Sequence, residues 1–247
     1  MSEELVVGVL ALQGGFEAHE RVLERLGARV REVRVPADLY GLRGLVIPGG
    51  ESTTISMGLE REGLSEPLRE LARGGMPVLG SCAGLIVLDR DHLGVMDIRA
   101  RRNAFGRQIR SFEADLQLSA LSDGPLRGIF IRAPWIAEHG PEVEILAEVD
   151  GHGVAAREGA LLAVAFHSEL GEDDRVHRLF LQSVGDYAAG AARSSASQPE
   201  SRRRSASSAA TPPRSPNRRL ATSRYTTTAT LMTNATILKA VVRCAIS

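Results

Sequence analysis

Short apolar runs alternate with amphipathic stretches through the N-terminal part of the chain. The runs are brief and rich in β-branched residues, which is typical of buried strands. Residues 16–26 and 64–72 instead place apolar side chains at helical spacing among charged ones, and Gly74-Gly75 marks the end of the second stretch. This alternation predicts an α/β domain with a largely parallel central sheet. The strands predicted here are residues 5–11, 31–35, 44–48 and the run from Val78 into Cys82.

The pattern changes beyond Asp97. Residues 97–154 contain shorter β-like stretches separated by turns, including 128–132 and 143–149, and Asp150-Gly151 is typical of a hairpin turn. Residues 161–166 form the last predicted strand. Because the α/β pattern is continuous, residues 1–187 are predicted to form one domain. Its closing helix, residues 176–187, is expected to bury Leu179, Phe180 and Val184.

The composition shifts abruptly after Gly190 to Ser, Arg, Thr, Ala and Pro. Such a segment buries too little apolar surface to offset the entropy of ordering it, so residues 191–230 are predicted to be disordered. We therefore separate a Ser/Arg/Thr-rich tail, residues 188–247, from the domain. A dispensable extension and an out-of-frame translation of an arginine-rich coding region both account for this tail. Contact of a basic tail with nucleic acid or an anionic surface is the less favoured interpretation.

The formal net charge of zero hides a difference between these two parts. Residues 188–247 contain ten Arg or Lys and one acid, which leaves twenty bases and twenty-nine acids in residues 1–187. An acidic domain gives no support for nucleic-acid binding. The sequence shows neither a signal peptide nor an apolar run long enough to span a membrane. Its only cysteines, Cys82 and Cys244, form no disulfide framework, so a cytoplasmic protein is expected.

An apolar run enters the motif Gly80-Ser81-Cys82-Ala83-Gly84 and is followed by a helical pattern. This arrangement is typical of a strand-to-helix elbow that carries a nucleophile. The glycines leave room for the tight turn, and free N–H groups at the start of the next helix favour a reactive thiolate. The alternative is a buried cysteine that acts as a small hydrophobe. The two flanking glycines favour the nucleophile.

A cysteine nucleophile needs a base and a group that orients the base. His167 follows the last predicted strand directly, at the edge where α/β sheets place their sites. Glu169 lies two residues on, and in an extended segment these two positions share a face. The sequence therefore predicts a Cys82–His167–Glu169 triad. The other histidines are interpreted as structural or solvated: His19, His92, His139, His152 and His177.

A predicted strand ends in Pro48-Gly49-Gly50. Backbone N–H groups there approach a ligand without hindrance from side chains, which suits donors to an oxyanion. Ser52 and Thr53 suit the cap of a following helix. A plain tight turn explains the glycines equally well. The sequence has no metal-ligand cluster, and this segment lacks a P-loop lysine, so neither a metal nor a cofactor is expected.

Together these motifs resemble the class I, or triad, glutamine amidotransferases, and more narrowly the glutaminase subunit of pyridoxal 5'-phosphate synthase. Gly-x-Cys-x-Gly alone indicates the class, whereas PGGESTT, RNAFGRQ and FIRAP are specific to this subunit. The resemblance covers residues 5 to about 187 and none of the tail. The matching segments are residues 8–14, 45–54, 80–85, 102–107, 111–116, 130–134 and 166–169, the last leading to Arg175-Val176-His177.

The resemblance implies a three-layer amidotransferase-like domain that hydrolyses L-glutamine without a cofactor. Cys82 would attack the side-chain amide, His167 would transfer protons, and Glu169 would orient His167. The ammonia would pass to a separate synthase subunit, the partner in a hetero-oligomer. The family's glutamine-binding positions fall on Gly49, Gly50, Glu51, Arg102, Ile131 and Arg132. Its oxyanion donors fall on the backbone of Gly50 and Ala83, and a position near the partner contact falls on Gln13.

Two departures from the family pattern bear on activity. Ser168 stands between His167 and Glu169 where the family has proline, and the loss of a fixed φ can loosen their geometry. Residues 89–92 also look shorter than in typical members. Neither departure removes a triad member, so an active enzyme is expected. A catalytically weak assembly subunit of the same complex and a class I amidotransferase that serves another acceptor stay open as alternatives.

Overall fold

The computed structural model describes residues 5–102 and 111–196. A nine-stranded sheet runs through this part in the order β2-β1-β3-β4-β11-β10-β8-β5, with β9 paired to β10. Its first five strands are parallel: β2 (Arg29–Val33), β1 (Val6–Leu10), β3 (Gly44–Ile47), β4 (Val78–Ser81) and β11 (Leu161–Val164). Antiparallel strands extend it: β10 (His152–Glu158), β8 (Trp135–His139), β5 (Ile98–Arg101) and β9 (Glu144–Val149). A separate hairpin joins β6 (Ser111–Leu116) to β7 (Leu126–Ile131).

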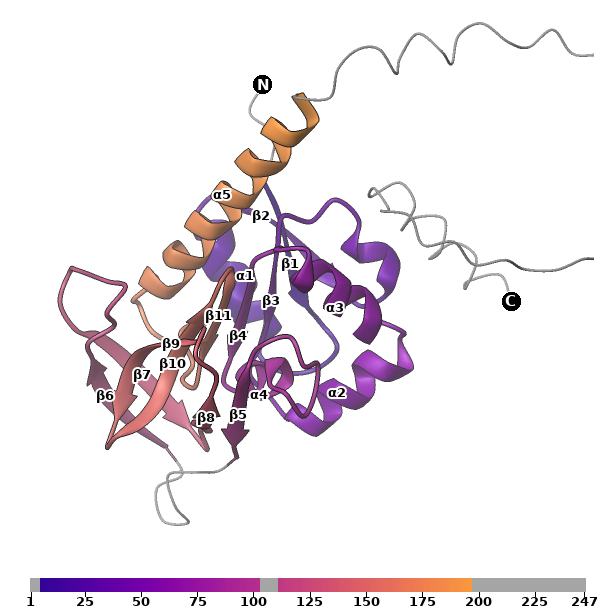
Figure 1. Ribbon diagram of the computed structural model, residues 1–247. Helices are drawn as coiled ribbons and strands as arrows, with labels where there is room; N and C mark the ends of the chain where they lie inside the picture. The colour runs from indigo at the N-terminus through magenta and orange to yellow at the C-terminus, as the bar shows by residue number, and fades with distance from the viewer. Residues whose placement is uncertain (1–4, 103–110, 197–247) are drawn as a thin grey trace, which may run out of the picture. The chain divides into compact units, whose positions relative to one another are not determined.

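Helices cover both faces of the parallel strands (Figure 1). Gly44 of β3 lies directly under Val184 of α5, whereas Gly80 of β4 lies under Leu88 of α4. Gly80 pairs with Ile47, whose side chain faces away from that of residue 44 because side chains alternate along a strand. Helices α4 and α5 therefore lie on opposite faces. The helices are α1 (Phe16–Arg25), η1 (Pro36–Leu39), α2 (Ser52–Arg61), α3 (Ser65–Arg73), α4 (Ala83–Leu88) and α5 (Arg175–Ala196).

The central strands are buried along their whole length. Every residue of β3, β4 and β11 is buried, as expected for parallel strands covered by helices on both faces. A buried contact joins α1 to α5 on one face, and α2 packs on α4 on the other. The predicted α/β domain with a mostly parallel central sheet is confirmed. It places the carboxyl ends of β3, β4 and β11 side by side.

The turn predicted at Asp150-Gly151 is confirmed, with φ values of 51° and 75° between the antiparallel strands β9 and β10. The strand predicted at residues 128–132 instead runs from Leu126 to Ile131. It ends there because Arg132 adopts a φ of 46°, which leaves the extended conformation. In this part of the chain the sequence therefore predicted the turn correctly, but it placed both ends of the strand at residues 128–132 too late.

Helix α5 is longer than the sequence pattern predicts. It continues past Tyr187 to Ala196, so the disorder predicted from Ala191 onward is wrong for residues 191–196. Alanine is the strongest helix former, and the stretch has no proline before Pro199, which explains the extension. Contacts group the chain up to Ala192 as one unit, while the tail beyond Ala196 and most of the RNAFGR motif lie outside the described residues. None of the helices described has the length and apolar character that a membrane span requires.

Candidate active site

Cys82 lies at the sharp turn between β4 and α4. Its φ of 50° and ψ of −102° form a strained combination for a residue with a side chain. Gly84 lets the helix pass close to the sheet, because a Cβ there would lie 2.1 Å from the carbonyl oxygen of Ile47. The predicted strand-to-helix elbow is therefore confirmed. It presents the thiol at the carboxyl edge of the parallel strands, where ligands of α/β proteins bind.

His167 and Glu169 follow β11, which pairs with β4 up to the residue before Cys82. The Nδ1 atom of His167 lies 2.6 Å from Oε1 of Glu169, and His167 lines the same cavity as Cys82. Ser168 between them is buried and leaves this contact intact. The structure thus brings together the three side chains that the sequence predicts as a triad.

The electrostatics of this relay favour an imidazolium next to a carboxylate. Burial lowers the pKa of His167, but hydrogen bonds to Cys82 and Glu169 outweigh it and raise the pKa to about 10. Burial raises the pKa of Glu169, but the hydrogen bond from His167 and the neighbouring imidazoles outweigh it and lower the pKa to about 2. Glu169 is therefore ionised at neutral pH and fixes the Nδ1 proton of His167. The other ring nitrogen is left for proton exchange.

The loop after β3 passes directly beside the relay. A Cβ on Gly49 would lie 2.6 Å from Cε1 of His167, so glycine is needed for this close approach. The carbonyl of Gly49 accepts a hydrogen bond from the N–H of Gly15 at 3.0 Å. The N–H of Glu51 donates to Oε1 of Gln13 at 2.9 Å. The loop after β1, which contains Gln13, therefore holds the predicted oxyanion loop in place.

Glu51 caps the start of helix α2. Its carboxylate accepts hydrogen bonds from the N–H groups of Thr53 (3.1 Å) and Thr54 (2.7 Å) and from the Thr54 hydroxyl (2.8 Å). These bonds, those from Thr54 foremost, lower the pKa of Glu51 to about 2. The predicted cap at Ser52 and Thr53 is wrong, because the longer Glu51 side chain reaches the free N–H groups of the first turn.

A cavity of about 360 Å³ opens beside Cys82 and His167. This volume is within the range of small-molecule sites. Two arginines, Arg102 and Arg132, give its wall positive charge, and the carbonyl oxygen of Ile131 lies 3.9 Å from Sγ of Cys82. Two predicted site residues, Gly49 and Glu169, do not line the cavity but lie next to His167. The lining residues are Gln13, Gly50, Glu51, Ser52, Cys82, Ala83, Ile86, Arg102, Ile131, Arg132, Pro134 and His167.

Residues 9–186 match the SNO glutamine amidotransferase family. The chain belongs to this family. It is 52% identical over 183 residues to the pyridoxal 5'-phosphate synthase subunit PdxT of Pelotomaculum thermopropionicum, covering 71% of this chain and 93% of the relative. It is 51% identical to the PdxT subunit of Dehalococcoides mccartyi, covering 73% of this chain and 98% of that one. A crystal structure of a glutamine amidotransferase, 44% identical, superposes with a TM-score of 0.69 over 72% of this chain and 98% of that chain.

In this amidotransferase, neighbouring side chains hold Arg102 at the cavity wall. Its Nη1 donates to Oγ1 of Thr53 at 2.9 Å, and its Nη2 lies 3.0 Å from Nε2 of His92. The Nδ1 atom of His92 lies 2.6 Å from Oδ1 of Asp89. A guanidinium can only donate, so Nε2 of His92 accepts and the ring proton lies on Nδ1. Residues 89–92 thus reach the cavity through Arg102.

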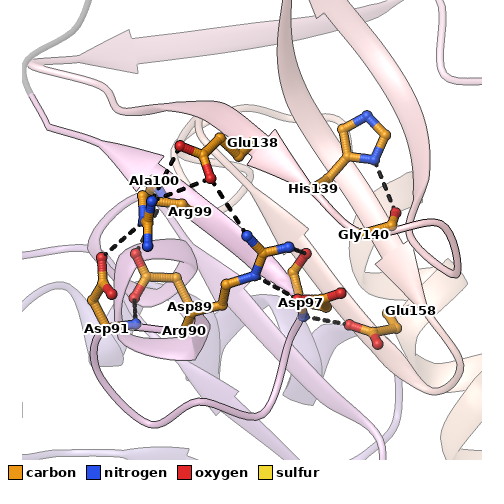
Figure 2. A network of polar contacts seen from close by, with 10 residues as sticks. All are labelled: Asp89, Arg90, Asp91, Asp97, Arg99, Ala100, Glu138, His139, Gly140 and Glu158. Carbon is orange, nitrogen blue, oxygen red and sulfur yellow. Dashed lines mark hydrogen bonds and ion pairs between the residues drawn. The ribbon is translucent and has the colours of Figure 1, made fainter.

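Figure 2 shows how Asp89, at the end of α4, ties this segment to the sheet. Its buried carboxylate accepts hydrogen bonds from the N–H groups of Asp91 (2.9 Å) and Ala100 (3.1 Å). Exposed ion pairs surround it, among them Arg99 Nη1 to Glu138 Oε1 at 3.1 Å, which links β5 to β8. The buried carboxylate fixes the connection from α4 to β5 more firmly than the exposed pairs do.

Sequence reasoning missed the polar residues that surround Glu169. His19, His177 and Ser81 are fully buried and contact Glu169 directly or through one another. A signal existed, because His19 lies three residues from both Phe16 and Val22 on the apolar face of its helix. A polar side chain at such a position needs a buried partner, but the partner is not evident from the sequence. Within residues 5–102 and 111–196, no group of side chains is arranged to hold a metal.

Proposed function

We propose that this chain hydrolyses L-glutamine to glutamate and ammonia through a cysteine thioester. The observation that carries the proposal is the Cys82–His167–Glu169 relay at a cavity that also contains Arg102 and Arg132. A thiol activated by an imidazole suits attack on an amide. A guanidinium suits the α-carboxylate of an amino acid. Membership of the glutamine amidotransferase family supports the same reaction.

In the first half-reaction, Sγ of Cys82 attacks the side-chain amide carbon of glutamine. An S–C bond forms, and the carbonyl electron pair moves to oxygen, where the N–H groups of Gly50 and Ala83 stabilise the charge. The C–N bond then breaks. The imidazolium of His167 gives its proton to the leaving nitrogen, which departs as ammonia and leaves a glutamyl thioester.

In the second half-reaction, water attacks the thioester carbon and His167 takes its proton. The C–S bond breaks, which returns the thiolate and releases glutamate. Glu169 stays ionised throughout and orients His167 through Nδ1. Each half-reaction therefore uses His167 once as an acid or a base, with a pKa set by its two neighbours.

The remaining predicted positions bind the substrate. Arg102 is already oriented by Thr53 and His92, so little side-chain freedom is lost when it meets a carboxylate. Gly49, Gly50 and Ile131 present backbone groups next to the thiol. Glu51 contributes through its main chain, because its carboxylate is committed to the start of α2. The substrate site thus combines fixed cations with main-chain donors and acceptors.

We further propose that the ammonia passes to the synthase subunit of pyridoxal 5'-phosphate synthase in the cytoplasm, with Gln13 near the contact between the subunits. The PdxT relatives are named as subunits of that synthase, and they match the chain over nearly their whole length. Gln13 suits this role because it touches the oxyanion loop directly. The free thiol of Cys82 suits a reducing compartment.

The test is ammonia release from glutamine by the full chain, alone and with the synthase subunit from the same organism. We expect Cys82→Ala to lower the rate at least about 1000-fold, since the thiol is the group that forms the thioester. Cys244→Ala is the matched control and should leave the rate unchanged. No release from the unmodified chain in a stable complex would contradict the proposal and favour an assembly subunit. Release without formation of pyridoxal 5'-phosphate would point to another acceptor.

A further inference from the structure

Two histidines that this mechanism does not use lie behind Glu169. His19 of α1 and His177 of α5 are fully buried, with His19 Nδ1 2.9 Å from His177 Nε2. The Nε2 atom of His19 lies 3.3 Å from Oε2 of Glu169, the oxygen that does not contact His167. Ser81 Oγ lies 3.1 Å from the same oxygen. A chain of polar contacts therefore runs from the triad into the space between α1 and α5.

One arrangement of protons gives each of these contacts a donor and an acceptor, although the 3.3 Å contact of His19 Nε2 with Glu169 lies outside hydrogen-bond geometry in this structure. A neutral imidazole has one N–H donor and one bare nitrogen acceptor. Ionised Glu169 can only accept, so His19 carries its proton on Nε2. Its Nδ1 then accepts, so His177 carries its proton on Nε2 as well. The nitrogen left over is Nδ1 of His177, which has no hydrogen-bond partner among the described residues. It is a bare nitrogen in this arrangement, and the buried N–H on Nε2 of His19 has Oε2 of Glu169 at 3.3 Å without the geometry of a hydrogen bond.

Burial favours the neutral form of both rings. Burial lowers the pKa of His19, and burial lowers the pKa of His177 to about 3. The carboxylate of Glu169 opposes this shift for both rings without overcoming it. The pair therefore acts on Glu169 through the polar contact of His19 Nε2 at 3.3 Å rather than through a charge. The titratable and charged groups that face the pair are Glu169, His167, Asp174 and Arg25.

Ser81 cannot replace this donor completely. Its single hydroxyl proton has two acceptors at 3.1 Å, the carbonyl oxygen of Phe166 and Oε2 of Glu169. A buried carboxylate needs all its donors, because an ionised group that is incompletely hydrogen-bonded is costly in a low-dielectric interior. With His19 removed, the outer oxygen of Glu169 would depend on a shared hydroxyl. The carboxylate would then be free to turn and to take up a proton.

We propose that His19, held in its tautomer by His177, is a positioning residue of the triad. It fixes the outer oxygen of Glu169 and so directs the inner oxygen at Nδ1 of His167. This role rests on the proposed glutaminase function, since its consequence is a correctly oriented base. It extends the chain of polar contacts from three side chains to five, with His19 on α1, His177 on α5 and the triad after the ends of β4 and β11.

The first test needs no variant. In the unmodified full chain, ¹⁵N NMR of the histidine rings should show His19 and His177 neutral between pH 5 and pH 8, each protonated on Nε2. This spectrum is independent of turnover, so it tests the arrangement even if the chain releases no ammonia. A proton on Nδ1 of His19, or a charged ring, would overturn the proposal, because His19 could not then donate as described.

The second test is kinetic and uses the chain with its synthase partner. His19→Leu removes the donor and should lower kcat about 10- to 100-fold, with the KM for glutamine changed less than twofold. The acid limb of the kcat–pH profile should move to higher pH by about one unit, since Glu169 then takes up a proton more readily. His19→Gln retains a side-chain N–H donor. Compared with His19→Leu, it should recover most of kcat, and its acid limb should lie at the original pH.

A matched control separates positioning from packing. Val22→Ala removes a buried side chain from the same helix without touching Glu169. It should lower stability while leaving kcat and the acid limb unchanged. If His19→Leu does not fold, His177→Gln gives the same readout, with a smaller fall in kcat because His19 stays in place. Unchanged kcat and pH limb in a folded donor-free variant, or a His19→Gln variant as defective as His19→Leu, would overturn the proposal.

Discussion

At the scale of single residues, Gly49 sets how closely the oxyanion loop can approach the base. A methyl group there would meet the imidazole of His167 at 2.6 Å, and Glu169 holds that ring through Nδ1. We therefore expect Gly49→Ala to displace the imidazole and lower kcat about 100-fold, as measured by ammonia release. The matched substitution is Gly185→Ala in α5, where nothing lies within 4 Å of the new Cβ.

Gly185→Ala should raise the free energy of unfolding by about 0.5–1 kcal/mol, because alanine is the better helix former, and should leave kcat unchanged. A Gly49→Ala protein with normal kcat would show that the imidazole has room to move. The sequence alone does not tell whether Gly49 is there for a tight turn or for a close approach to the base. The distance to His167 makes that distinction.

At the scale of elements, the connection from α4 to β5 depends on one buried carboxylate. Asp89 orients His92, and His92 accepts from Arg102, so Asp89→Asn should loosen the arginine proposed to bind the substrate carboxylate. That contact is the same in the ground state and the transition state. We therefore expect KM for glutamine to rise about tenfold with kcat changed little, in steady-state kinetics.

The control for the element is Arg99→Ala in β5. It breaks only exposed ion pairs, with Glu138 and Asp91, and should leave KM within twofold. If Asp89→Asn and Arg99→Ala raised KM equally, the loss of any charge near this connection would raise KM, and the buried carboxylate would have no special role. An unchanged KM for Asp89→Asn would show that Thr53 alone holds Arg102.

Elements that position the triad were predictable because their signals are local. Apolar runs mark β4 and β11, and Gly80 and Gly84 mark the elbow, all within a few residues of the side chains they place. The contacts of His19 with His177, and of His92 with Arg102, depend instead on how separate elements pack. The end of α5 was missed because polar composition outweighed helix propensity in the prediction.

At the scale of the whole molecule, buried titratable groups tie the stability of the domain to pH. The pKa of His177 is about 3 when folded, against 6.5 in its ordinary state. Below pH 6.5 the unfolded chain therefore binds a proton that the folded chain does not, and stability falls as the pH drops toward 3. The lowered pKa of His19 acts in the same direction. Below pH 4.5 the lowered pKa of Glu169, about 2, adds a further loss.

His167 has the opposite effect on how stability depends on pH. Its folded pKa of about 10 lies above 6.5, so its stabilisation is complete below pH 6.5 and is lost as the pH rises toward 10. Stability should therefore be greatest near pH 6.5–7. Urea unfolding midpoints between pH 4 and pH 10 would test this. Each histidine that is fully neutral when folded and charged when unfolded contributes a slope of about 1.4 kcal/mol per pH unit.

Two substitutions distinguish the acid side from the alkaline side of the dependence of stability on pH. His177→Gln should flatten the acid side and His167→Gln the alkaline side, because each removes one titrating ring. His167→Gln also reduces the loss below pH 4.5, since it removes the hydrogen bond that lowers the pKa of Glu169. His139→Gln changes an exposed ring and should leave both sides as they are. Stability that rises from pH 7 to pH 4 would contradict the neutral histidine pair. It would do so through the unfolding of the whole domain, a readout that owes nothing to turnover.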